Sequence, residues 1–472
     1  MLNNDLPSLS SCNLLHFGYY VSAVMENTYN QNKGGFIMQH LQTSFFYDLQ
    51  ELIRTALLMR KYYLIFKALD LSALKDKNYG VGATGHSRHA MLRAFIIKHL
   101  EGIKSVPFLI DYLNSIPPLL EMCGFELGNL PDESQFYRFL QNTKNSTLKE
   151  IHKKTDDLLI KDGSVSLEEF ILDSKPVMAA TRDNNFKNPN RNTRDKSKKP
   201  KRNPHATLSY YSCQIINGKK QNTVFFWGYR THAIVTEEGI CLVEKTLPNN
   251  VTDADAAYGL IKALKRRFRF KRGAIFIADK AYDVRELYTF IVEKMKLQPY
   301  IPINPRNQKN GKTFGPHGCP VCDAGFEMKS VGRWTEGNRQ RIKFHCPIKA
   351  SKKFAAKVGQ VCPVKHRSFD TGKCYGCTKY LDVTDDARSR VPRDSKEFRQ
   401  IFKDRQIIEQ YFSRLGDREV EQTSHYSFTA ISNQMTIAHL STSLIALAAA
   451  VILKQPDNIR CYRTFARLPK TS

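Results

Sequence analysis

The first 160 residues carry the apolar spacing of α-helices, apart from an opening stretch, residues 1–39, that lacks this spacing and is expected to be poorly structured. The expected helices span residues 87–103, 105–115, 117–123 and 133–142. In the first of these the apolar side chains fall on one face, which leaves Lys98 available for solvent. Asp132 can cap the last one. The pattern predicts an all-α domain over residues 40–160.

The short helices of this domain allow two interpretations. Two short helices, a turn at Gly124 and a capped third helix are compatible with a helix-turn-helix DNA-binding unit, in which Arg138 would contact DNA. An ordinary helical bundle has the same pattern.

After residue 165 the apolar positions follow the period of strands. Strands are expected within residues 167–177, 207–216, 223–235 and 240–246, then a helix at 253–264, a strand at 274–278, a helix capped by Asp283 and a strand at 298–303. The first strands form an antiparallel meander with a tight turn at Asn217-Gly218, and the later strand-helix-strand units predict parallel neighbours. Antiparallel strands continuing into parallel ones are the layout of a ribonuclease H-like sheet.

This layout divides the chain further. We expect a mixed α/β, ribonuclease H-like catalytic domain that begins at 165–304, is interrupted by a Cys-rich insertion at 305–392 and ends at 393–455, before a C-terminal tail at 456–472. The apolar run from Met435 to Leu453 is long enough to span a membrane, but it contains His439 and several hydroxyl side chains, so we expect a buried helix.

Positive charge is the unusual feature of the composition, with 72 Lys and Arg against 45 Asp and Glu and a net charge of +27. Such an excess is typical of a protein that binds a polyanion, and a membrane surface is the rival partner. Two basic runs concentrate this charge, at 182–202 and 262–272. We expect them to contact phosphates, whereas a solvated face or pairing with a helix dipole is the alternative. The candidate contacts are Lys198, Lys199, Lys201, Arg202, Arg266 and Arg267.

Six of the 11 cysteines are clustered within the insertion: Cys319, Cys322, Cys346, Cys362, Cys374 and Cys377. The first and last pairs have C-x-x-C spacing, which in a chain without a secretory signal indicates zinc before disulfides. The two pairs could form one site, or each could combine with the two central cysteines. Reduced cysteines without metal are the alternative.

Three carboxylates occupy positions that are difficult to solvate. Asp173 interrupts an apolar strand, Asp279 ends the next buried strand, and Glu409 borders the buried stripe of a helix, one turn from Arg405. Three such charges would repel one another unless divalent cations neutralised them. Two Mg²⁺ or Mn²⁺ ions held there would activate a water or a 3′-hydroxyl for attack on a phosphodiester. His232 could lie near this site, or it could be an ordinary structural histidine.

At these residues the chain resembles the DDE transposases of bacterial insertion sequences, which are ribonuclease H-like. The resemblance covers roughly residues 85–455. It rests on the block at 85–140, on DSKPV around Asp173, GYRTHAIV, LPNNVTDADA, ADKAYD around Asp279, the C-x-x-C insertion and VPRDSKEFRQIFKDRQIIEQYFSRL around Glu409. It implies that Asp173, Asp279 and Glu409 are the metal-binding triad and that Arg405 contacts DNA near the cut.

The same resemblance implies a function. The chain would recognise its element's ends in double-stranded DNA, cut there and join the 3′-hydroxyls to target DNA as a dimer, in the cytoplasm at the nucleoid and away from membranes. A transposase-derived DNA-binding protein without catalysis and a structure-specific nuclease are the alternatives. The family's helix signature ends in a lysine, where this chain has Gly416, and begins with a tyrosine, where it has Phe402. Arg414 or Arg418 could replace the lysine.

Overall fold

The computed structural model describes residues 47–77, 85–185, 199–216, 219–304, 319–337, 339–371, 376–382 and 395–460, together with residues 315, 317, 387, 388, 391 and 393. The predicted extension at 1–39, the Asn217-Gly218 turn, Lys198 and Cys374 lie outside these residues.

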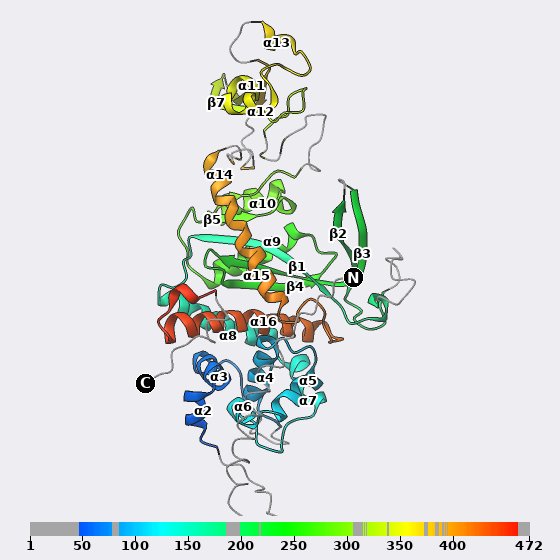
Figure 1. The fold of residues 1–472 in the computed structure, drawn as a ribbon, viewed down its shortest axis with the longest axis vertical. Coiled ribbons are helices and arrows are strands. Elements are labelled where there is room, and N and C mark those ends of the chain that lie inside the picture. The colour runs from blue at the N-terminus through cyan, green and yellow to red at the C-terminus, as the bar shows by residue number, and fades with distance from the viewer. Residues whose placement is uncertain are drawn as a thin grey trace, which may run out of the picture. The chain divides into compact units, whose positions relative to one another are not determined.

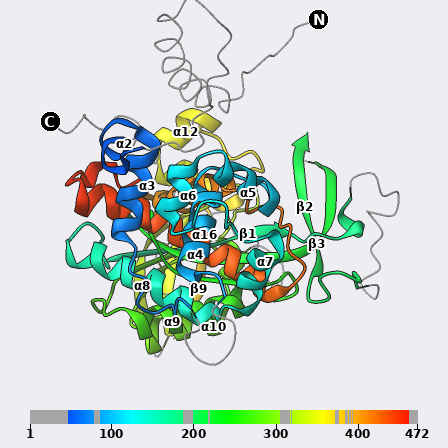
Figure 2. The same cartoon turned by 90° about the horizontal axis from the view of Figure 1, so that it is seen from below.

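The described chain is helical from α2 to the end of α8 at Lys161 (Figures 1 and 2). Its helices are α2 (Leu49–Thr55), α3 (Leu57–Ala68), α4 (Arg88–Leu100), α5 (Val106–Asn114), α6 (Pro117–Cys123), α7 (Glu133–Asn142) and α8 (Asn145–Lys161). The predicted starts and stops are confirmed where a local side chain or backbone feature sets them. Asp132 accepts a hydrogen bond from the backbone of Ser134, and Gly124 ends α6 in the left-handed region, with a φ of 100°.

One expectation for this region is wrong. Lys98 does not face solvent but is only 1% exposed, because α4 is surrounded by α5, α6, α7 and the C-terminal helix α16. A helix at the centre of a bundle is buried on every side, so its weak amphipathic pattern does not identify a solvent face.

The sheet has the predicted strands and directions. Its members are β1 (Glu169–Met178), β2 (Thr207–Ile216), β3 (Lys219–Thr236), β4 (Cys241–Pro248), β5 (Ile275–Ala278) and β6 (Gln298–Tyr300), in the order β2-β3-β1-β5-β6 with β4 paired to β3. The pairs β1/β3, β2/β3 and β3/β4 are antiparallel, and β1/β5 and β5/β6 are parallel. The helix α9 (Asp253–Arg267) connects β4 to β5.

Strand β1 is buried on both faces. Phe170 and Leu172 belong to a core shared with the N-terminal helices, whereas Ile171 belongs to a second core with Ile408 and Leu415. The second core is formed by α15 (Arg405–Gly416), which packs against β1 and follows α14 (Lys396–Ile401) and a 3-10 turn (Phe402–Asp404). Alternate residues of β1 therefore face α15.

The apolar C-terminal run forms α16 (Phe428–Leu447) and continues into a π-helical turn (Ala448–Ile452). Among the described residues this is the one helix with the length and composition to cross a membrane, yet 89% of its most apolar stretch is buried inside the protein. It lies between the N-terminal helices and the sheet and contacts α4, α7, α8 and β4 (Figure 1). The long apolar stretch of α16 is explained by its position inside the protein.

The insertion contains β7 (Lys329–Glu336), β8 (Arg339–His345) and β9 (Thr378–Asp382), which form a separate antiparallel sheet, and three short helices. These helices are α11 (Pro347–Ala350), α12 (Lys352–Val358) and α13 (Arg367–Asp370). A small apolar cluster of its own, which includes Met328, Phe344 and Ile348, supports this sheet.

The predicted helix cap at Asp283 is wrong. The helix α10 (Arg285–Thr289) has no side-chain cap, and the Asp283 carboxylate is instead fully buried. It accepts two hydrogen bonds from Arg388, at 2.7 and 2.6 Å, and one from the backbone of Asn304. A residue far along the chain thus supplies the countercharge, which local sequence rules cannot anticipate.

Candidate active site

The register of the sheet places two of the predicted carboxylates next to each other. Leu172 of β1 and Ala278 of β5 are the last parallel pair of these strands, so the residues that follow them, Asp173 within β1 and Asp279 just after β5, lie where this pairing ends. Paired strands lie about 5 Å apart. The two acids, more than a hundred residues apart in sequence, are therefore neighbours in the fold.

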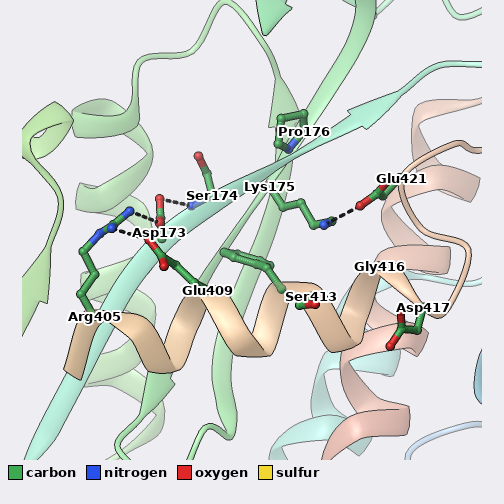
Figure 3. A pocket seen from close by; sticks show the side chains of 11 residues that line it. Asp173, Ser174, Lys175, Pro176, Arg405, Glu409, Ser413, Gly416, Asp417 and Glu421 are labelled. Atoms are coloured by element: carbon green, nitrogen blue, oxygen red, sulfur yellow. Dashed lines mark hydrogen bonds and ion pairs between the residues drawn. The ribbon is translucent and has the colours of Figure 1, made fainter. Parts of the chain in front are cut away.

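The third carboxylate joins them through an arginine. One side of α15 is buried through Ile408, Phe412 and Leu415. Arg405 and Glu409 therefore point toward Asp173 of β1 (Figure 3). The Arg405 guanidinium donates to Asp173 Oδ2 at 3.0 Å and to Glu409 Oε1 at 2.6 Å. Asp279 also acts on the charge of Arg405. Arg405 thus contacts two of the acids directly and is influenced electrostatically by the third.

Burial and mutual repulsion dominate the electrostatics of this edge. Burial raises the pKa of Asp173 to about 6, although Arg405 and a hydrogen bond from the Ser174 backbone oppose the rise. Burial also raises the pKa of Asp279, against a hydrogen bond from the backbone of Ala281. Burial alone would lower the pKa of Arg405, but the neighbouring carboxylates outweigh it and raise that pKa. Arg405 and the backbone hydrogen bonds therefore offset only part of the free-energy cost of keeping Asp173 and Asp279 ionised at this edge.

A fourth acid, Asp253, is part of the same edge and was not predicted. It begins α9, where Thr252 caps the helix, and it accepts a hydrogen bond from Ser174 Oγ at 3.2 Å. Its charge raises the pKa values of Asp173 and Asp279. The sequence pattern identified this aspartate only as the start of a helix. The signal that could have revealed it is the topology, because the helix after β4 begins beside the point where the parallel pairing of β1 and β5 ends.

The predicted neighbour His232 lies beside Asp253, with its Nδ1 3.8 Å from Asp253 Oδ1. It is fully buried, and neither ring nitrogen has a hydrogen-bond partner among the described residues. Burial, together with nearby cations, lowers the pKa of His232 to about 3, so the ring is neutral at physiological pH. The histidine therefore adds no positive charge to the acidic edge.

The donor set has the right chemistry for a divalent cation, although the described residues contain no group of three His, Cys, Asp or Glu side chains gathered tightly enough to hold a metal ion as they stand. Asp173, Asp279 and Glu409 offer hard oxygen atoms, which suit Mg²⁺ and Mn²⁺. The raised pKa values of Asp173 and Asp279 show that these carboxylates lack full compensation. Arg405 now occupies the position between Asp173 and Glu409 that a cation would share.

The predicted basic residues that the structure describes lie away from the three carboxylates. Arg138 is exposed on α7, and Lys199, Lys201 and Arg202 are exposed before β2. The Arg202 guanidinium lies over the Tyr426 ring, 4.8 Å from its centroid. Arg266 is exposed and Arg267 half-buried at the far end of α9, about 20 Å along the helix from Asp253. None of these described cations lines the cavity beside Asp173, Arg405 and Glu409.

Four of the predicted zinc cysteines line one small cavity in the insertion: Cys322, Cys346, Cys362 and Cys377. Cys319 is buried but does not line this cavity, and Cys374 lies outside the described residues. Burial, with the neighbouring thiols, raises the pKa of Cys377 to about 12 when no metal is bound. No disulfide joins the described cysteines. Zinc binding remains a prediction, and the thiols of these four cysteines are its candidate ligands.

Acidic side chains from neighbouring strands and from a facing helix are the kind of ligand set with which enzymes hold divalent cations for chemistry on phosphodiesters. Two family profiles match the chain: Transposase DDE domain over residues 167–444 and Transposase domain (DUF772) over residues 51–142. The first covers more than half of the chain, which therefore belongs to the DDE transposases.

No curated protein matches the chain. Among solved structures, it is similar to the piggyBac transposase in a cryo-EM synaptic complex with hairpin DNA, at 11% sequence identity and a TM-score of 0.36. That similarity covers 88% of this chain and 80% of the other.

Proposed function

We propose that this transposase cuts DNA at the ends of its own insertion sequence and joins the freed 3′-hydroxyls to target DNA. The observation that carries the proposal is the meeting of Asp173, Asp279 and Glu409 around Arg405 at one sheet edge. The strand order supports a ribonuclease H-like catalytic domain, in which acids at this edge act on phosphodiesters.

Each residue has a proposed role. Asp173, Asp279 and Glu409 would hold two Mg²⁺ or Mn²⁺ ions, which when bound would activate the attacking oxygen and stabilise the leaving one. Asp173 must be ionised to take part, and a bound cation would itself favour the ionised form and so lower the pKa from its raised value of about 6. Arg405 holds Asp173 and Glu409 in place before the ions bind, and its guanidinium is then close enough to contact the DNA backbone at the cut.

The partner we propose is double-stranded DNA, bound by the basic surfaces on both sides of the site. The exposed cations Arg138, Lys199 and Arg266 extend the positive surface beyond the carboxylates. The piggyBac structure contains hairpin DNA, which agrees with this choice of partner. Because two ends must be joined, we expect a dimer on DNA, acting at the nucleoid in the cytoplasm.

The proposal is tested with a labelled duplex that carries the element's end sequence, a target plasmid, and Mg²⁺ or Mn²⁺. The wild-type chain should cut and join, whereas Asp173→Asn and Glu409→Gln should bind the duplex and do neither. Asp417→Asn, an exposed acid just after the same helix, is the matched control and should keep activity. Hydrolysis without joining would favour a nuclease. Binding without either product would favour a DNA-binding protein that has lost catalysis.

A further inference from the structure

An open cavity of about 630 Å³ extends from the carboxylates along β1 and α15 (Figure 3). Asp173 to Pro176 line one side, and the other side is lined by Phe412, Ser413, Gly416, Asp417 and Glu421, from α15 and the following turn. Arg405 and Lys175 are the two cationic side chains among its lining residues. Arg405 is already engaged with the carboxylates, so Lys175 is the cation that remains for another anion.

The strand period explains why Lys175 faces this cavity. Ile171, Asp173 and Lys175 alternate along β1 and point to the same side, toward α15. Successive members of such a row are about 7 Å apart along the strand. A DNA strand with one phosphate at Asp173 would therefore bring a neighbouring phosphate toward Lys175.

Gly416 makes room for the lysine at the end of α15. A Cβ atom at position 416 would lie 3.3 Å from Lys175 Nζ and 3.0 Å from Glu421 Oε1. The ammonium thus lies against the helix where a side chain of residue 416 would begin. This is the position at which the helix signature of the family has its lysine, so β1 brings a lysine to a place that α15 leaves empty.

The two arginines that could have replaced the missing lysine do not reach the cavity. Arg414 donates to the backbone carbonyl of Arg460 at 2.7 Å, and Arg418 is only 6% exposed. Neither contributes to the lining of the cavity. Apart from Arg405, Lys175 is therefore the one cationic side chain among the lining residues that could bind a phosphate here.

Lys175 is paired with a carboxylate that is easily displaced. Its Nζ lies 2.7 Å from Glu421 Oε1, and the side chains are 16% and 62% exposed. An ion pair with one partner so exposed to water is weak. The backbone of Glu421 is fixed by a hydrogen bond from Met178, so its side chain can swing away while the chain stays in place. A phosphate oxygen could take the position of this carboxylate oxygen.

We propose that Lys175 binds a DNA phosphate beside the cut site and that Glu421 holds its ammonium until DNA replaces the carboxylate. The proposal rests on the proposed function only in taking DNA as the ligand. The DNA contact of the lysine that the family's signature places on α15 is then made by Lys175 of β1. A side chain at position 416 would crowd the Lys175 ammonium, which explains the glycine there.

Binding to a fluorescent duplex of arbitrary sequence, measured over a range of salt concentrations with the full chain, tests this assignment. Lys175→Gln should reduce the slope of log K against log salt by about 0.9, the value of one lost phosphate contact. Glu421→Gln should bind a few-fold more tightly, and this gain should vanish in the double variant with Lys175→Gln. Lys161→Gln, an exposed lysine on α8, is the control and should keep the wild-type slope.

A second variant tests the position itself. Adding Gly416→Lys to Lys175→Gln should restore the slope, because the new side chain begins next to the lost ammonium. An unchanged slope in Lys175→Gln, with native thermal unfolding, would overturn the proposal, and so would a gain from Glu421→Gln that persists without Lys175. These binding results do not require catalysis. A chain that shows them but never joins DNA would refute the proposed strand transfer and leave the role of Lys175 intact.

Discussion

Replacing Asp173 with asparagine should make the protein more stable while it removes activity. Burial raises the pKa of this carboxyl from an ordinary value of 3.8 to about 6, so the folded state resists its ionisation. Each pKa unit corresponds to about 1.4 kcal/mol, which gives about 3 kcal/mol at pH 8. The side chain is 18% exposed, so water screens little of this cost.

The sign of the pH dependence follows from the raised pKa. The wild-type chain gains stability from protonated Asp173 below about pH 4 and loses it as the pH rises through about 6. In a chelating buffer the melting temperature of Asp173→Asn at pH 8 should exceed that of the wild type by about 3 °C. The difference should shrink toward pH 4. Mg²⁺ or Mn²⁺ should stabilise the wild type and leave the variant unchanged.

The assay is thermal unfolding followed by circular dichroism, from pH 4 to pH 8. Asp417→Asn is the matched control, because its carboxylate lies in the same cavity but is exposed, and it should change stability by no more than about 0.5 kcal/mol. A variant no more stable than the wild type at pH 8, or equally stabilised at every pH, would show that Asp173 is not a desolvated acid.

Substitutions at three further sites, two of them with a comparison variant, have expected outcomes. Asp283→Ala should lower the free energy of unfolding by about 3 kcal/mol, because it removes the fully buried carboxylate that pairs with the half-buried Arg388 guanidinium, whereas the helix cap Asp132→Ala should cost about 1 kcal/mol. Urea unfolding that gives equal losses would contradict the ion pair. Asp253→Asn should slow strand joining about tenfold. It should also extend activity to lower pH, because it removes a charge that raises the pKa of neighbouring acids such as Asp173. A pH profile of joining rates that is the same for the variant and the wild type would refute this. Cys346→Ser should abolish bound zinc and Cys319→Ser should retain it, as measured by atomic absorption; a wild-type chain purified without zinc would refute the metal site.

Most elements could be predicted because their signals are local. Side-chain caps such as Asp132, the left-handed Gly124 and the alternating strands each depend on residues close in sequence. The parallel direction of the later strands followed from the rule that strand-helix-strand units are parallel and right-handed, whereas the strand order comes from the structure. From that order, the meeting of Asp173 and Asp279 is a direct consequence of register.

The remaining features depend on partners that are distant in sequence. Asp283 has the local pattern of a helix cap, yet Arg388 determines its role. Lys98 has the pattern of a surface residue, and the helix α16 buries it. Lys175 belonged to a recognised motif, but its function becomes visible only when Gly416 and Glu421 are placed beside it. Tertiary packing, rather than local propensity, decides each of these cases.

The wide spacing of the candidate acids along the sequence has a consequence for the nascent chain. Asp173 and Asp279 are synthesised well before Glu409, and the helix α16 that completes the interior comes after all three. A nascent or prematurely terminated polypeptide without Glu409 and α16 therefore holds only part of the candidate site and lacks its central support. Such a fragment should not have the cleavage activity that we propose for the full chain.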